Sequence, residues 1–371
     1  MPSLSETVTA PTLTEGRVTI RALGEQDVQG CWEQCVDPLS VRWTQVPSPY
    51  TIDDARDFCT SVAPAAWADG SQWIFAVEHE GRYAGNIALR DRGLGLAEVG
   101  YGAHPAARGT GALEAGLRLL LEWGFSERRL TTVIWHAEVG NWASRKLAWR
   151  LGFSVDGVLN RAHASRGRLV DAWIGTLLAG APREPATRWL VPPPVRADSI
   201  ALRPLGEQDV ARVVEACSDE RTRHWLGTLP TPYTDADAQT WFGLNIEAQA
   251  TGRKVTWAIV DADSDVLLGA INLFDINEHD CELGYWAHPD ARGRGVMTAA
   301  ARVATGWAFE HLGVQRVRAV AALDNSASRH VIEAAGFTQT GEERRGTVLR
   351  TGLADVALYD VLVSEWSPAD R

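Results

Sequence analysis

The chain repeats itself once, with almost constant spacing. Residues 98–111 and 282–295 are identical at 10 of 14 positions, at an offset of 282 − 98 = 184 residues. Residues 21–28 and 203–210 agree at 7 of 8 positions, at an offset of 203 − 21 = 182. Two copies are too few for a solenoid, which needs at least three stacked repeats. The 371 residues instead allow two complete domains of roughly 100–200 residues each.

The segment that joins the two copies is rich in proline and contains the run Pro192-Pro-Pro194. Such a run forms a semi-rigid spacer. We therefore predict a first domain over 16–180, a proline-rich linker over 181–197 and a second domain over 198–369.

Each copy contains a basic glycine loop between a strand-like stretch and an apolar helical pattern. The loops are Arg108-Gly-Thr-Gly111 and Arg292-Gly-Arg-Gly295. A helix N-terminus presents unpaired N–H groups and partial positive charge, so it binds phosphate or pyrophosphate, and glycine lets an anion approach closely. The N–H groups expected to do so belong to Gly109, Thr110, Gly111, Ala112, Gly293, Arg294, Gly295 and Val296. The alternative is an ordinary strand-to-helix turn. No Gly-Lys-[Ser/Thr] follows and Gly-x-Gly-x-x-Gly is not completed, which excludes Walker and dinucleotide loops.

Charge and cysteine content restrict the possible partners. The net charge is −11 and the pI about 5.4, which argues against binding to nucleic acids or anionic membranes and suits a cationic substrate such as an amine. No apolar run approaches the ~18 residues of a membrane span, and the N-terminus lacks the apolar core of a signal peptide. The five cysteines fit no zinc module, so we predict reduced thiols, a cytoplasmic location and no metal.

Two further motifs follow the same order in both copies. They are Gly100-Tyr101 with Asn141 and Ser144, and Gly284-Tyr285 with Asn325 and Ser328; a Gly-Phe pair ends each copy's second helix. The order strand, glycine loop, helix, strand, Asn-x-x-Ser, Gly-Phe resembles the GNAT superfamily of acyl-CoA-dependent N-acyltransferases, most closely its ribosomal-protein-alanine (Rim) type. The loops depart from the family pattern at Leu113 and Met297. The resemblance implies an α/β fold, with a mixed, mainly antiparallel sheet flanked by helices in each copy.

The resemblance also implies a set of binding residues for acetyl-CoA or a related acyl-CoA. The loop residues and their arginines would hold the pyrophosphate, and backbone groups of the preceding strand would hold the pantetheine and thioester oxygen. Beside the eight loop residues above, these positions are Arg108, Arg292, Ala103, His104, Ala287, His288, Asn141 and Asn325. The alternatives are helix capping for the asparagines and partly buried structural side chains for the histidines.

Two kinds of side chain are candidates for catalysis. By resemblance, Ser144 and Ser328 would protonate the leaving thiolate. Many family members have a tyrosine seven residues after the asparagine, but Ala148 and Ile332 stand there, which leaves serine as the expected local hydroxyl. Glu98 and Glu282 would accept the amine proton, because each shares a strand face with a glycine and so with open space. The alternative for both is a structural hydrogen bond.

The implied function is transfer of an acetyl group from acetyl-CoA to a primary amine, either a peptide or protein N-terminus or an aminated small molecule. The alternatives are a CoA-binding sensor or scaffold with one or both copies silent, and a phosphate binder unrelated to CoA. The first copy has Trp135-His-Ala-Glu138 where the second has Ala319-Val-Ala-Ala322, so His136 or Glu138 is either an extra base or a surface residue. The second copy is favoured as the competent one. Tryptophans such as Trp225 and Trp241 suggest an apolar or aromatic acceptor, with core packing as the alternative explanation. Both a monomer and a homodimer stay open.

Overall fold

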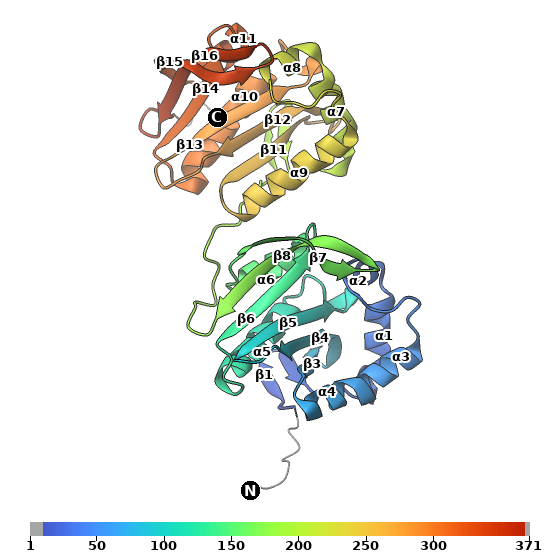
Figure 1. Ribbon diagram of the computed structural model, residues 1–371. Coiled ribbons are helices and arrows are strands. Elements are labelled where there is room, and N and C mark those ends of the chain that lie inside the picture. The colour runs from blue at the N-terminus through green and yellow to red at the C-terminus, as the bar shows by residue number, and fades with distance from the viewer. Residues whose placement is uncertain (1–9, 368–371) are drawn as a thin grey trace. The chain divides into compact units, whose positions relative to one another are not determined.

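The computed structural model describes residues 10–367 and divides between Ala186 and Thr187 into two compact units. Each unit contains one eight-stranded mixed sheet with helices on both of its faces (Figure 1). The order of helices and strands in the second unit largely repeats that of the first. This confirms the predicted α/β fold for both copies.

The elements of the first unit begin with two short edge strands and end in a long hairpin. They are β1 (Leu13–Glu15), β2 (Val18–Arg21), α1 (Val28–Val36), α2 (Pro38–Trp43), α3 (Ile52–Asp57), the π-helical turn Phe58–Val62, α4 (Ala63–Asp69), β3 (Gln72–His79), β4 (Arg82–Asp91), β5 (Leu96–Ala103), α5 (Ala112–Ser126), β6 (Thr132–Glu138), α6 (Trp142–Arg150), β7 (Gly157–Ser165) and β8 (Arg168–Leu178).

The second unit follows the same plan, with one long helix in place of α3 and α4. Its elements are β9 (Val195–Ala197), β10 (Ile200–Arg203), α7 (Val210–Ser218), α8 (Glu220–Trp225), α9 (Asp235–Ala250), β11 (Lys254–Asp261), β12 (Leu267–Phe274), β13 (Asp280–Ala287), α10 (Val296–Trp307), the π-helical turn Ala308–Leu312, β14 (Arg316–Ala322), α11 (Ser326–Ala334), β15 (Thr338–Leu349) and β16 (Gly352–Leu362).

One pair of strands in each sheet is parallel, and this pair opens the sheet. The strand orders are β1-β2-β3-β4-β5-β6-β8-β7 and β9-β10-β11-β12-β13-β14-β16-β15. All neighbours are antiparallel except β5–β6 and β13–β14, which α5 and α10 connect as crossover helices. The parallel pairing ends at Glu98 and Leu283, although β5 and β13 continue to Ala103 and Ala287. We call the unpaired stretch beyond these residues the strand gap.

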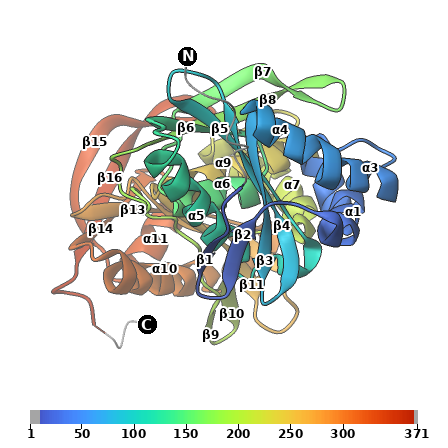
Figure 2. The same ribbon diagram turned by 90° about the horizontal axis from the view of Figure 1, so that it is seen from below.

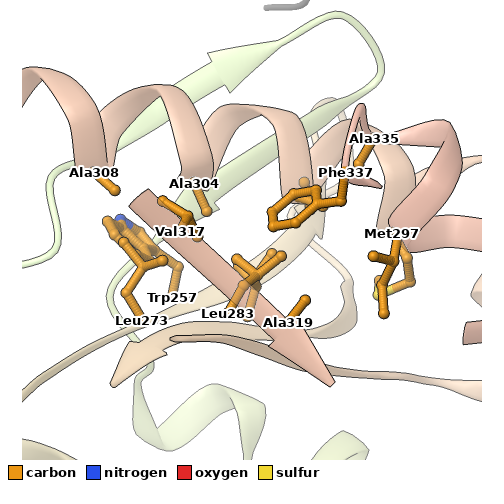
Figure 3. Packing of buried hydrophobic residues seen from close by; sticks show 14 of the residues in the cluster. Trp257, Leu273, Leu283, Met297, Ala304, Ala308, Val317, Ala319, Ala335 and Phe337 are labelled. Atoms are coloured by element: carbon orange, nitrogen blue, oxygen red, sulfur yellow. The ribbon is translucent and has the colours of Figure 1, made fainter. Parts of the chain in front are cut away.

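Small residues on α10 let this helix lie close to its sheet. Ala304 and Ala308 face Trp257 of β11 and neighbouring strand residues such as Val317 in one buried cluster (Figure 3). Met297, near the start of α10, and Phe337, which follows α11, lie in the same cluster. Burial of large apolar side chains stabilises a fold by about 1.5–3 kcal/mol each. The packing therefore fixes the start of α10 against the sheet.

The opposite face of each sheet packs on the helices that precede β3 or β11. Figure 2 shows α5 and α6 on one side of the first sheet and α1 and α3 on the other. In the second unit, Val213 of α7 and Phe242 of α9 pack on Ala258 and Val260, whereas the alternate residues Trp257 and Ile259 pack toward α10. Successive strand residues point to opposite faces, so one strand serves both layers.

The ends of the predicted domains differ from the structure in detail. Leu13–Glu15, placed before the predicted first domain, forms strand β1 and pairs with β2. Val195–Ala197, placed in the predicted linker, forms β9 and pairs with β10. The Trp257 indole N–H also donates to the Pro193 carbonyl at 3.0 Å, so this part of the proline segment belongs to the second unit. The predicted end at 369 lies outside the described residues.

All five cysteines have free thiols and are buried. Across residues 10–367, no cluster of His, Cys, Asp or Glu has the geometry to hold a metal ion. The same stretch contains no helix with the length and apolar character needed to cross a bilayer.

Candidate active site

Backbone N–H groups of β13 point into the strand gap of the second unit. The His288 N–H donates to the Leu268 carbonyl at 2.9 Å, on the β12 side. Along a strand, N–H groups alternate between its two edges. The N–H groups of Tyr285 and Ala287 therefore face β14, beyond the point where pairing with β14 ends.

The first unit repeats this pattern. The His104 N–H donates to the Ala84 carbonyl at 2.9 Å, which directs the Ala103 N–H into the gap. In each Ala-His pair, the alanine N–H therefore faces the gap, whereas the histidine N–H is used within the sheet. The histidine side chains also have structural roles, since each Nδ1 accepts from the backbone N–H two residues later.

One cavity of about 520 Å³ gathers most of the residues predicted for the second copy. Tyr285 and Trp286 both line it. Because consecutive strand residues point to opposite faces, the cavity passes through the strand gap from one side of the sheet to the other. Its predicted lining residues are Ala287, Arg292, Gly293, Gly295, Val296, Asn325 and Ser328. Glu282, His288 and Arg294 do not line it.

The glycine loop of the second unit has the backbone geometry of an anion site. Gly293 and Gly295 have φ values of 71° and 73°, in the left-handed region that glycine favours. A Cβ at either position would meet nothing within 4 Å, so the surface above them is open. Across residues 10–367, the N–H groups of Gly293, Arg294, Gly295 and Val296 have no hydrogen-bond partner.

The arginine that opens each loop is engaged with the protein itself. Arg292 forms an ion pair with the carboxylate of Asp219 and donates to Thr222 Oγ1 at 2.9 Å. Asp219 is the N-cap of α8, whose last residue, Trp225, lines the cavity. Arg108 is paired in the same way with Asp37, the N-cap of α2. Each arginine therefore ties its loop to the N-terminus of a helix.

A pair of hydroxyl groups lies at the start of α11. Tyr285 Oη is 2.9 Å from Ser328 Oγ and donates to the Ser328 carbonyl at 3.1 Å. Burial raises the pKa of Tyr285 to about 12, so the phenol is protonated at neutral pH. Asn325 Oδ1 accepts from the Ser328 N–H at 3.1 Å, which confirms its capping role.

The expectation that serine is the local hydroxyl on its own is wrong, because Tyr285 and Tyr101 supply a second one. A sequence signal was present: both tyrosines follow a glycine at the same place in the two copies. Sequence analysis also missed His330 and Trp286 as lining residues.

The two candidate bases differ in their surroundings. Glu98 pairs with Arg92, and its Oε1 is 3.6 Å from His136 Nδ1; the neighbouring His136 and Arg92 lower the pKa of Glu98 to about 2. Glu282 pairs with Arg318 at 3.2 Å, but burial raises its pKa. The open space that was expected beside each glutamate is present only beside Glu98, at Gly100. At Gly284, a Cβ would meet Phe274 at 3.0 Å, so the predicted open face of Glu282 is filled.

These pKa shifts predict opposite effects on stability. The lowered pKa of Glu98 stabilises the fold above its unfolded pKa near 4.5, and this is lost as pH falls toward 2. We expect Glu98→Gln to destabilise the protein by about 1–3 kcal/mol at pH 7 and by less at pH 3. Glu282→Gln is the matched control and should be neutral or stabilising at pH 7, because burial penalises its charged form. Melting curves at both pH values measure this; an equal loss at pH 3 and 7 for Glu98→Gln would mean that charge is not the cause.

The corresponding site of the first unit has additional side-chain contacts. Tyr101 Oη is 2.8 Å from Ser144 Oγ, and Asn141 caps α6 as Asn325 caps α11. Trp135 Nε1 lies 3.0 Å from Tyr101 Oη and 3.1 Å from Ser144 Oγ. Glu138 bonds Arg42 and Ser165, each at 3.0 Å. Glu138 is therefore not a free surface residue.

Comparison with known proteins decides the family. The acetyltransferase (GNAT) domain matches residues 17–154 and again 199–338. The chain belongs to the GNAT acetyltransferase family. It contains two GNAT domains in tandem, as its internal repeat and its resemblance to that superfamily predicted.

Curated relatives of this GNAT protein are bacterial. Over 102 residues it is 36% identical to the putative ribosomal N-acetyltransferase YdaF of Bacillus subtilis (strain 168), covering 27% of this chain and 56% of the relative. Over 171 residues it is 25% identical to the uncharacterized N-acetyltransferase p20 of Bacillus licheniformis, covering 45% of this chain and 96% of the relative. The YdaF match thus spans little more than half of that protein.

Solved structures of single acetyltransferases align with one half of the chain. A Mycobacterium smegmatis RimJ in complex with CoA-disulfide is 18% identical, covers 47% of this chain and 88% of its own, and gives a TM-score of 0.43. A Vibrio cholerae spermidine N-acetyltransferase in complex with CoA and spermine is 19% identical, covers 46% of this chain and 98% of its own, and gives a TM-score of 0.40.

Proposed function

We propose that the second unit transfers an acetyl group from acetyl-CoA to a primary amine. The observation that carries this proposal is the single cavity that crosses the sheet. It joins the open glycine loop, the backbone of β13 at the strand gap and the Tyr285–Ser328 hydroxyl pair. These are the groups needed to hold a thioester carrier, stabilise an oxyanion and protonate a thiolate.

The donor would bind from the loop inward. The free N–H groups of residues 293–296, at the start of α10, would bind the pyrophosphate. The pantetheine arm would then follow the unpaired edge of β13, as an added strand does at an open sheet edge. Asn325 uses Oδ1 to cap α11, so its Nδ2 would be the group that meets a pantetheine carbonyl.

In the reaction, the neutral amine nitrogen attacks the thioester carbonyl carbon. The Ala287 N–H, directed into the strand gap, would stabilise the oxyanion of the tetrahedral intermediate. The carbonyl re-forms as the C–S bond breaks, and the thiolate takes a proton from Ser328, which Tyr285 hydrogen-bonds at 2.9 Å and which regains a proton from water. Glu282 lies outside the cavity and pairs with Arg318, so the excess proton of the amine passes to water.

The walls of the cavity favour an acceptor with an apolar or aromatic body. Trp225, Leu226 and Trp286 line it, and its ionisable lining residues other than Tyr285 are Arg221, Arg292 and His330. Among residues 10–367, no carboxylate lines the cavity to bind a second ammonium group. The residues that line the cavity are more specific evidence about the acceptor than the acidic net charge of the whole chain, which had favoured a cationic substrate.

We therefore expect an aromatic amine such as tyramine, or a dipeptide with an N-terminal aromatic residue, to exceed spermidine in kcat/KM by at least about tenfold, a difference of 1.4 kcal/mol. The measurement is free thiol released from acetyl-CoA across an amine panel. Preference for spermidine would contradict the assignment of the acceptor. If none of the amines in the panel causes thiol release although CoA still binds, the result would refute the enzyme and favour a CoA-binding sensor.

A further inference from the structure

We propose that the first unit is a closed copy of the acyltransferase site, in which the chain's own side chains occupy the groups that ligands use in the second unit. Three residues that differ between the copies produce this closure: Thr110, Trp135 and Glu138. They act at the loop, at the hydroxyl pair and at the acceptor side. The part of this inference that concerns catalysis rests on the proposed function, whereas the part that concerns binding does not.

At the loop, Thr110 satisfies N–H groups that are free in the second unit. The Thr110 N–H donates to the Ala107 carbonyl, and the Ala112 N–H to Thr110 Oγ1, each at 3.3 Å. Ala112 begins α5, so its N–H is one of the groups that an anion at the helix N-terminus would use. The second copy has Arg294 at this position, and its side chain is 52% exposed and cannot accept a hydrogen bond. An anion at the first loop must displace bonds that do not exist at the second.

At the hydroxyl pair, Trp135 fills the place beside Ser144. Its side chain is 1% exposed, and its indole N–H lies within hydrogen-bond distance of both Tyr101 Oη and Ser144 Oγ. The corresponding residue of the second unit is Ala319, whose methyl group reaches neither hydroxyl. The Tyr285–Ser328 pair there faces the cavity. An indole in place of a methyl group therefore takes both the space and the hydrogen bond that a thioester sulfur would need.

At the acceptor side, Glu138 ties three elements together. It ends β6, accepts from Arg42 of α2 and from Ser165 of β7, and its side chain is only 12% exposed. Arg166, at the hairpin tip, adds a bond of 2.7 Å from Nε to the Val41 carbonyl. In the second unit the hairpin also contacts α8, through the Arg350 N–H and the His224 carbonyl at 3.3 Å. Ala322 takes the position of Glu138 there, and therefore no carboxylate reinforces this contact between the hairpin and α8.

The three contacts oppose the three events of the reaction: binding of the pyrophosphate, seating of the thioester and entry of the amine. Each uses a side chain that is present in the first copy and replaced in the second. A ligand entering the first unit would have to break all of them, and buried polar groups left unpaired are costly. We therefore infer that one chain binds one acyl-CoA, in the second unit.

The test is calorimetric titration of the full chain with CoA. We expect one CoA per wild-type chain, and no binding at the same concentrations by Gly295→Val, which obstructs the second loop. Two equivalent sites in the wild type, or a site that survives Gly295→Val, would overturn the closed copy.

The converse variant gives the first unit the residues of the second: Thr110→Arg with Trp135→Ala and Glu138→Ala. We expect a second CoA site to appear, and Trp135→Val in place of Trp135→Ala, with the other two changes kept, maintains the test if the larger cavity unfolds the unit. Stoichiometry that stays at one in both variants, with melting curves showing both units folded, would refute the roles of these residues. Because the readout is binding, a protein that binds one CoA and acetylates no amine would refute the proposed function yet support the closed copy.

Discussion

Gly295→Val should weaken CoA binding at least a hundredfold. Gly295 has a φ of 73° directly before α10, and a side chain there would project into the open space above the loop. It would therefore stand where the pyrophosphate approaches the N–H groups of residues 293–296. Hydrogen bonds to charged groups contribute about 1.5–3 kcal/mol each, so loss of two of them corresponds to about two orders of magnitude or more. Calorimetry with CoA measures this directly.

The backbone strain that valine introduces at Gly295 must be separated from its effect on CoA binding. The first copy supplies the control. Gly111→Val places the same side chain at the equivalent loop position, where φ is 83° and a Cβ also meets open space. A non-glycine residue in this conformation costs about 1–2 kcal/mol in either unit, so both variants should melt at a lower temperature. Only Gly295→Val should lose CoA. Equal loss in the two variants would show that both loops bind the carrier.

Ser328→Ala should lower kcat by about 10²–10⁴-fold while CoA affinity changes less than about threefold, the effect of removing a general acid. Ser328 Oγ lies 2.9 Å from Tyr285 Oη, and the loop proposed to bind the pyrophosphate precedes another helix, α10. Tyr285→Phe should reduce kcat less, because the serine hydroxyl remains, although its orienting partner is lost. Steady-state kinetics at saturating acetyl-CoA and a titration of the same samples separate the two effects.

The matched variant in the first unit is Ser144→Ala. Trp135 and Tyr101 already hold this hydroxyl, so its removal should leave turnover within about twofold. A loss of turnover in Ser144→Ala with none in Ser328→Ala would reverse the assignment of the working copy. If kcat is unchanged in both variants, the thiolate is protonated by water and the hydroxyl pair serves packing.

Local features of the site were readable from the sequence. The left-handed glycines of the loop and the capping asparagines depend on residues within about one helical turn, and their patterns occur twice. In the sequence, the closure of the first unit was visible only as residues that differ between the two copies. That Trp135 reaches Ser144 depends on how β6 and α6 pack, because the indole must cross from one element to the other.

The sequence by itself determined that there are two copies, that each is an α/β GNAT domain, and where each loop and helix cap lies. Tertiary structure alone decided what those residues meet. Tyr285 and Ser328 are 43 residues apart, Arg292 and Asp219 are 73 apart, and Glu138 and Arg42 are 96 apart. Whether a side chain faces a cavity, an ion pair or another hydroxyl follows from the packing of distant elements, and neither periodicity nor local propensity encodes that packing.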